Sequence, residues 1–124
     1  RKESSAASDV YKRQSQQLVD TVNAAKDGGH RVCAVSTSVL KGIATAVSMG
    51  GHMKTYDGWT NKFIFPPYEF TVTDALVSNF HLPYSTMLMM VAAFGGYDLI
   101  MSAYEKAVSE KYRFGVYGDA MLII

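Results

Sequence analysis

Apolar residues follow the chain in blocks of different period, and these blocks predict alternating helices and strands. From Ser15 they recur at helical spacing, which predicts a helix that ends at the two glycines at 28–29. The sequence RVCAV at 31–35 predicts a short strand that is buried on both faces. Hydroxyl residues at 36–38 can cap a further helix that runs to about residue 49. This order is typical of half an α/β unit.

The second half of the chain predicts two more strands and two more helices. Residues 50–59 are expected to form a loop because of their glycines, and KFIF at 62–65 predicts a strand that ends at two prolines. The segment 68–80 begins extended, and its second half fits either a strand or a helix. The last elements are an apolar helix, an amphipathic helix and an apolar strand, at about 87–94, 98–111 and 120–124. The predicted class is therefore α/β, with a mixed sheet and packed helices.

The first fourteen residues have neither period and are rich in serine, alanine and charge. They predict a disordered lead, or sequence foreign to the fold, ahead of one domain at 15–124. The net charge is +1, but the lead holds four basic and two acidic residues, so the remainder has eight basic and nine acidic ones. A polyanion must therefore meet a local basic patch, because the overall field does not attract it.

Composition also bears on membranes, compartment and metals. The apolar block at 87–94 is too short to cross a bilayer, since a spanning helix needs about 20 apolar residues. No charged segment followed by an apolar one opens the chain, as a secretory signal would. The single cysteine, Cys33, agrees with a reducing compartment, and no Cys/His cluster suggests zinc. We therefore expect a cytoplasmic location, no membrane and no metal.

Polar residues collect directly ahead of the apolar helix at 87–94. Ser85 or Thr86 caps this helix, whose first N–H groups suit a phosphate, a carboxylate or a developing anion. His81 can act as a general base, since the ordinary pKa of histidine is about 6.5, and Asn79 lies beside it. Spacing alone also allows a plain capped helix with a packed histidine, so both interpretations stay open.

Two further segments carry candidate chemistry. Thr37 and Ser38 lie in a strand-to-helix turn, where open α/β sheets often bind ligands, although these hydroxyls can simply cap the helix. Arg113 and Tyr117 lie in a basic and aromatic segment that suits phosphate contact and base stacking. Asp119 can act as a base or can bond its own turn.

Three long motifs carry a resemblance to a known family. They are GWTNKFIFPPYEF at 58–70, DALVSNFHLPYSTMLMMVAAFGG at 74–96 and AYEKAVSEKYRFGVYGDAMLII at 103–124. In this order and spacing they resemble the C-terminal part of the S-adenosylmethionine:tRNA ribosyltransferase-isomerase (QueA) family, over roughly residues 15–124. Members of that family are several hundred residues long, so the resemblance implies a C-terminal fragment of a larger α/β enzyme.

The resemblance implies a tRNA-modifying transferase of queuosine biosynthesis. Such an enzyme transfers and isomerises the ribosyl moiety of S-adenosylmethionine onto 7-aminomethyl-7-deazaguanine at the tRNA wobble position, which gives epoxyqueuosine. S-adenosylmethionine is then a consumed co-substrate, tRNA with a precursor base is the partner, and no metal is implied. The full-length enzyme is expected to be a monomer, and the fragment is expected to be inactive alone.

The resemblance also suggests roles for the motif residues. His81 or Asp119 is expected to transfer protons, and the two are expected to line one cleft, because the rigid apolar helix fixes the residues at its start. The positions expected to bind substrate are Thr37, Ser38, Asn79, Ser85, Thr86, Arg113 and Tyr117.

One turn departs from the pattern of the family. The family usually has Gly-Thr-Thr after the first strand, then an arginine and a glutamate on the helix, where this chain has Ser36, Lys41 and Ala44. Lysine does not reproduce the fork of arginine, and alanine removes a carboxylate. These changes support the alternative of a catalytically degenerate relative that acts as a ligand- or tRNA-binding module. A truncated sheet is also expected to expose apolar surface and to favour dimerisation or aggregation.

Overall fold

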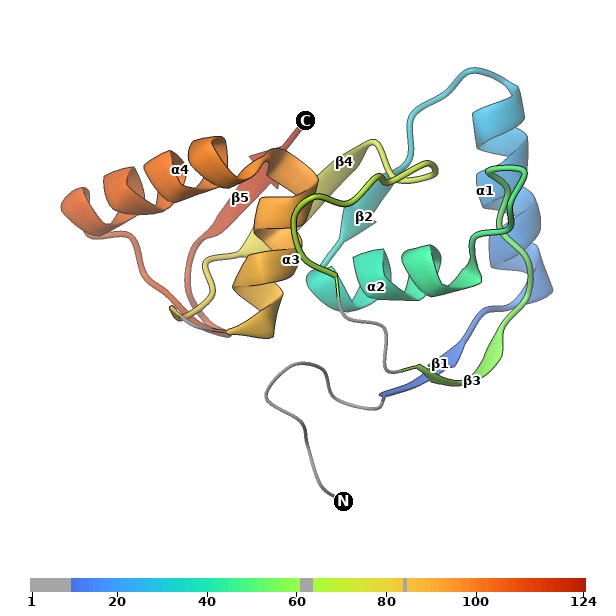
Figure 1. Cartoon of the computed structure of the whole chain (residues 1–124), viewed down its shortest axis with the longest axis horizontal. Coiled ribbons are helices and arrows are strands. Elements are labelled where there is room, and N and C mark those ends of the chain that lie inside the picture. The colour runs from blue at the N-terminus through green and yellow to red at the C-terminus, as the bar shows by residue number, and fades with distance from the viewer. Residues whose placement is uncertain (1–9, 61–63, 84) are drawn as a thin grey trace.

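The computed structural model describes residues 10–60, 64–83 and 85–124, which form two small sheets and four helices (Figure 1). In chain order the elements are β1 (Val10–Arg13), α1 (Gln16–Asp27), β2 (Cys33–Val35), α2 (Thr37–Ala46), β3 (Asp57–Thr60), β4 (Ala75–Asn79), α3 (Thr86–Gly95), α4 (Tyr97–Ser109) and β5 (Ala120–Ile123). The predicted α/β class, with a mixed sheet and packed helices, is confirmed.

The larger sheet has the strand order β2-β4-β5, in which β2 and β4 are parallel and β5 is antiparallel to β4. This sheet lies behind α2 and α3 in Figure 1. The core lies between the sheet and the helices, because β4, α2, α3 and α4 each contribute a side chain that is at most 2% exposed. These are Leu76, Leu40, Val91 and Ile100.

The other face of this sheet is apolar and open. Val35 on β2 is 63% exposed and Leu122 on β5 is 60% exposed. The prediction that the first strand is buried on both faces is therefore wrong, because this chain places helices against one face only. The expectation that the sheet exposes apolar surface is confirmed, and dimerisation through that surface stays a prediction.

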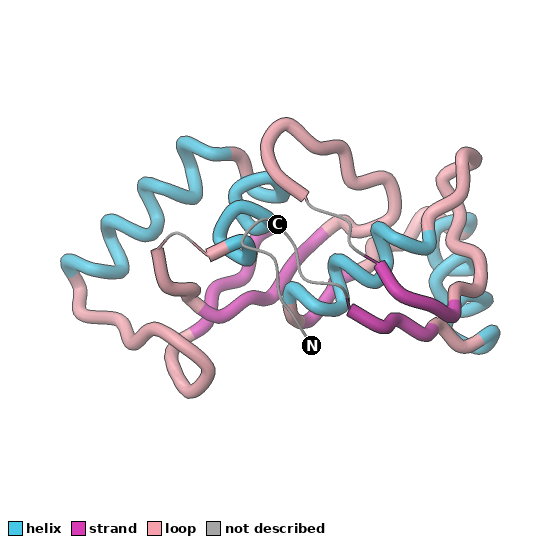
Figure 2. Tube along the Cα trace, turned by 60° about the horizontal axis from the view of Figure 1, so that its bottom comes forward, coloured by secondary structure: helices cyan, strands magenta, loops and turns pink. Residues whose placement is uncertain are grey.

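The smaller sheet pairs β1 with β3 in antiparallel register, with Arg13 opposite Asp57. Figure 2 shows this pair apart from the three-stranded sheet. The prediction of an unstructured lead is thus wrong for Val10–Arg13, and residues 1–9 lie outside the described residues. The strand predicted at 62–65 lies partly outside them too, and its described part, Ile64 and Phe65, is not in a strand. Ile64 is 1% exposed, so its apolar character reflects core packing of an irregular segment.

Serine side chains cap the starts of α1, α2 and α3, whereas α4 begins after Gly96 without a side-chain cap. Ser15 accepts the N–H of Leu18 at the start of α1, and the helix ends at Gly28. Ser85, rather than Thr86, caps α3 by accepting the N–H of Leu88 at 3.2 Å. α2 ends earlier than predicted, because the backbone of Val47 is extended and forms a β-bridge with Met53. The second half of 68–80, which the sequence left as either a strand or a helix, forms the strand β4.

The two last helices meet at a sharp bend. No single helix in the described part of the chain is long and apolar enough to cross a bilayer. α3 and α4 reach that length and composition only together, and the bend between them is 118°.

Candidate functional site

The three predicted site segments lie at the carboxyl edge of the parallel strands. The turn at 36–38 follows β2, the segment at 79–81 ends β4, and β5 begins at the same edge, since Asn79 is the register partner of Ala120. The Ser36 N–H donates to the Val77 carbonyl at 2.8 Å, which joins the turn to β4. Open α/β sheets bind ligands outside this edge.

The end of β4 is bonded directly to the loop at 113–119. The Phe80 N–H donates to the Asp119 carbonyl at 3.3 Å, and the Gly115 N–H donates to the Phe80 carbonyl at 2.9 Å. The Asn79 side-chain amide reaches the same Asp119 carbonyl at 3.4 Å. The two segments are therefore neighbours, as expected, and a shared cleft between them stays a prediction.

His81 is held at both its backbone and its ring. Its backbone N–H donates to the Tyr104 hydroxyl at 2.9 Å, and its Nε2 lies 3.1 Å from Ser78 Oγ. Burial lowers the pKa of His81, because desolvation disfavours the charged imidazolium. Burial also raises the pKa of Tyr104, and the hydrogen bond from His81 opposes this shift. The imidazole is thus neutral near pH 7, which is the form that a base needs.

Ser78 and Tyr104 were not among the residues predicted for the site. Ser78 could have been noticed as a polar residue in the apolar strand, three positions before His81. No pattern in the sequence points to Tyr104, because it lies 23 positions from His81 and contacts it only in the folded chain.

Asp119 closes its own loop. Its Oδ2 accepts the Arg113 backbone N–H at 2.7 Å, and its own N–H donates to the Arg113 carbonyl at 2.8 Å. Gly118 fits between them because a Cβ there would lie 2.4 Å from the Arg113 carbonyl oxygen. Asp119 was predicted either to act as a base or to bond its own turn, and this geometry favours the second interpretation. The loop presents Tyr117, which is 94% exposed, beside the exposed Arg113.

The β2–α2 turn has an unusual backbone. Ser36 has φ 93° and ψ 152°, a region that favours glycine, while its Oγ caps α2 by accepting the Val39 N–H at 3.3 Å. Thr37 is buried and Ser38 is exposed. The turn therefore keeps a glycine-like conformation although serine occupies it.

The α3 start carries the two other predicted residues. Ser85 Oγ is engaged by the cap, and Thr86 is the first helical residue; both are half-buried. Their position at the amino end of the apolar helix agrees with the expected anion-binding role, which stays a prediction.

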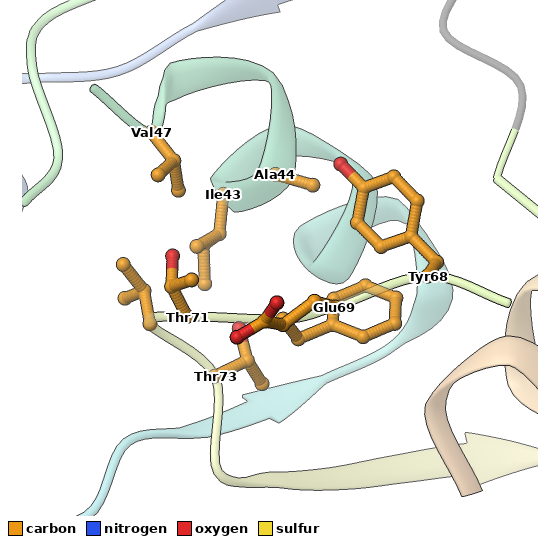
Figure 3. Close-up of a pocket in the computed structure, with 9 residues that line it drawn as sticks. Ile43, Ala44, Val47, Tyr68, Glu69, Thr71 and Thr73 are labelled. Carbon is orange, nitrogen blue, oxygen red and sulfur yellow. The ribbon is translucent and has the colours of Figure 1, made fainter. Parts of the chain in front are cut away.

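A cavity of about 40 Å³ lies between α2 and residues 68–73 (Figure 3). The Glu69 carboxylate points toward Thr71 and Thr73 in this view, and the buried Thr73 hydroxyl has no hydrogen-bond partner among the described residues. The described lining includes Ala44 but none of the predicted site residues. Phe70 contacts Phe94 near the end of α3, so the cavity lies away from His81, which precedes the start of that helix. The described residues contain no group of three or more His, Cys, Asp or Glu side chains that could hold a metal.

A mixed sheet with polar residues clustered at the carboxyl edge of its parallel strands defines an α/β protein of the kind that binds ligands at strand ends. The class can be narrowed by comparison with known proteins. The chain belongs to the queuosine biosynthesis protein family, whose model matches residues 4–123. This match confirms the resemblance and includes most of the predicted lead.

Similar proteins are much longer than this chain. The S-adenosylmethionine:tRNA ribosyltransferase-isomerase of Parabacteroides distasonis is 65% identical over 107 residues, which cover 86% of this chain and 31% of that protein. The protein of the same name from Bacteroides fragilis is 63% identical over 110 residues, 89% of this chain and 31% of that protein. The crystal structure of S-adenosylmethionine tRNA ribosyltransferase from Thermotoga maritima superposes with a TM-score of 0.85 at 44% identity, covering 90% of this chain and 39% of that one. The chain thus spans about a third of the length of these curated relatives.

Proposed function

We propose that the chain is the C-terminal part of a cytoplasmic transferase of queuosine biosynthesis. The whole enzyme transfers and isomerises the ribosyl moiety of S-adenosylmethionine onto 7-aminomethyl-7-deazaguanine at the tRNA wobble position, and epoxyqueuosine-tRNA forms with release of adenine and methionine. S-adenosylmethionine is a consumed co-substrate, and no metal or membrane takes part. The observation that carries this proposal is the identity with the ribosyltransferase-isomerase of Parabacteroides distasonis, which extends over most of the chain.

The reaction needs a proton acceptor, and His81 suits that role. The sulfonium makes the adjacent ribose carbon electrophilic, and the exocyclic amine attacks only when it is neutral, so protons must leave as the ring rearranges. His81 is half-buried, and the lowered pKa keeps it neutral. Asp119 is assigned a positioning role, because its carboxylate already accepts the Arg113 N–H.

Substrate binding is assigned to the residues around this base. Arg113 and Tyr117 are exposed on the loop beside His81, where a guanidinium can meet a tRNA phosphate and a ring can stack on a base. The amino end of α3, with Ser85 and Thr86, is suited to an anionic group of the substrate, and the Asn79 side chain lies at the loop, 3.4 Å from the Asp119 carbonyl oxygen. Thr37 and Ser38 contribute from the β2–α2 turn at the same edge. The full-length enzyme is assigned as a monomer, and this chain alone as inactive.

The second candidate function is a catalytically degenerate ligand- or tRNA-binding module. The observation that favours it is the backbone of Ser36, whose φ of 93° suits the glycine that the family resemblance places there. Lys41 and Ala44 depart from that resemblance on the following helix. This candidate keeps the fold and the ligand surface but loses turnover.

A chimera separates the two candidates. This chain replaces the matching third of the Parabacteroides distasonis enzyme, and adenine release from S-adenosylmethionine is measured with tRNA that carries the precursor base. The restored chimera also contains Ser36→Gly, Ser38→Thr, Lys41→Arg and Ala44→Glu. Higher turnover of the restored chimera than of the plain chimera favours the degenerate module, whereas equal turnover favours a competent fragment.

The role of His81 is tested in whichever chimera is active. We expect His81→Ala to reduce turnover by about 10²- to 10⁴-fold, the usual contribution of a general base. Ser109→Ala is the matched control, because Ser109 is an exposed hydroxyl that bonds only its own helix. If His81→Ala and Asp119→Asn both leave turnover intact, the assignment of the site is wrong. Calorimetry of the isolated chain with S-adenosylmethionine and with precursor tRNA tests binding separately.

A further inference from the structure

Ser78 lies next to the His81 ring and is almost completely buried. It is 2% exposed, on the face of β4 that the helices cover. Its Oγ lies 2.8 Å from the Asn79 carbonyl oxygen and 3.1 Å from His81 Nε2. Because the buried Ser78 hydroxyl contacts both the Asn79 carbonyl and the His81 ring, it constrains which ring nitrogen of His81 carries a proton.

The direction of both hydrogen bonds follows from a count of protons. A carbonyl oxygen only accepts, so the 2.8 Å contact requires the Ser78 hydroxyl to donate to Asn79. A serine hydroxyl has one proton, and Oγ must therefore act as the acceptor toward His81. The proton between Ser78 and His81 is then the one on Nε2. In the neutral imidazole the other nitrogen, Nδ1, has no proton.

We propose that Ser78 is a positioning residue that fixes His81 as the Nε2–H tautomer and leaves Nδ1 as the nitrogen that accepts the proton from substrate. The catalytic half of this inference rests on the proposed function, whereas the tautomer stands on the hydrogen-bond geometry alone. Tyr104 on α4 supports this arrangement, because its hydroxyl accepts the His81 backbone N–H and so holds the backbone of His81 in place. The lowered pKa of His81 is consistent with a neutral ring.

The tautomer is measured by NMR on the 124-residue chain with ¹⁵N-labelled histidine. Long-range ¹H–¹⁵N correlations at about pH 7.5 identify which ring nitrogen carries the proton, and His81→Gln assigns the signal. We expect a protonated Nε2 and an unprotonated Nδ1. A protonated Nδ1, an even mixture of tautomers or a doubly protonated ring overturns the proposal.

Substitution at Ser78 tests whether this hydroxyl is the cause. In Ser78→Ala the Nε2 proton loses its buried acceptor, so we expect its exchange with water to accelerate on the order of tenfold or more and the tautomers to mix. Ser78→Thr keeps a hydroxyl and is expected to restore the parent signal, and Ser109→Ala is expected to leave it unchanged. If the His81 signals and exchange rate in Ser78→Ala match those of the parent chain, Ser78 does not fix the ring.

Activity of the chimera separates this proposal from the proposed function. We expect Ser78→Ala to lower kcat about tenfold with little change in KM for tRNA, as a misoriented base does. The acidic limb of the kcat/KM profile is expected to move to lower pH, because the imidazolium also loses an acceptor. If His81→Ala is fully active while the NMR tautomer is as expected, the catalytic role that the proposed function gives to His81 fails and the assignment of the tautomer stands. If His81→Ala is inactive while Ser78→Ala shows unchanged kcat and pH profile, the positioning role fails.

Discussion

The two helices that start at the carboxyl edge of the sheet use the same cap on different backbones. Ser36 Oγ accepts the Val39 N–H at the start of α2, and Ser85 Oγ accepts the Leu88 N–H at the start of α3, at 3.3 and 3.2 Å. Ser85 is extended, with φ −83° and ψ 149°, whereas Ser36 has φ 93° and ψ 152°. The backbone of Ser85 is therefore unstrained, whereas the backbone of Ser36 is strained.

This difference separates the two halves of the candidate site. The end of β4, which leads into α3, is joined to the loop at 113–119 by hydrogen bonds between Phe80 and Asp119 and between Gly115 and Phe80, and the sequence of both segments agrees with the family motifs. The β2–α2 turn has a backbone conformation that favours glycine, but Ser36 occupies it. We infer that any loss of function in this chain arises at the turn, and substitutions on both sides can test this contrast.

The largest effect is expected in the loop at 113–119, which is hydrogen-bonded to the end of β4. In Gly118→Ala the new Cβ would lie 2.4 Å from the Arg113 carbonyl oxygen, a backbone atom that cannot swing aside. We expect the free energy of unfolding to fall by about 3 kcal/mol, as for severe overpacking. Urea denaturation measures this loss. Gly50→Ala is the control, because no atom lies within 4 Å of the position that its new methyl group would occupy, and a similar loss there would remove the steric explanation.

The same substitution is expected to have opposite signs at the two caps. Ser36→Gly relieves the strained backbone and is expected to raise the free energy of unfolding by about 1 kcal/mol, after the small loss of the cap. Ser85→Gly relieves nothing and is expected to lower it by about 0.5 kcal/mol. Thermal unfolding of both variants makes the comparison. Equal shifts of the same sign would show that Ser36 is not strained.

The smallest effect is a dependence on pH that comes from His81. Burial lowers the pKa of His81 in the folded chain, so the unfolded chain takes up the proton first as the pH falls. The free energy of unfolding is therefore expected to decrease as the pH falls below the ordinary pKa of about 6.5. Urea titrations at about pH 7.5 and about pH 5.5 measure the slope. His81→Gln should reduce this slope, and an unchanged slope in that variant would show that other groups cause the pH dependence.

Local sequence patterns predicted the helices and the α3 cap because the signals act within a few residues. Ser85 precedes its apolar helix, and Gly96 ends it by donating its N–H to Ala92. The β1–β3 pair was missed because its register joins residues far apart, such as Arg13 and Asp57, and depends on backbone ladders. The candidate site residues were predicted from local sequence patterns and from the family resemblance, but the contacts of His81 with Ser78 and Tyr104 exist only after folding.

The end of β4, the start of α3 and the loop at 113–119 are expected to act as one ligand-binding surface. An NMR titration of the ¹⁵N-labelled chain with S-adenosylmethionine and with the precursor anticodon stem-loop can decide this. We expect the amide signals of residues 79–81, 85–86 and 113–119 to shift together with the same apparent affinity. Shifts confined to the residues around the cavity at 68–73, or no shift with either ligand, would show that these segments do not form such a surface.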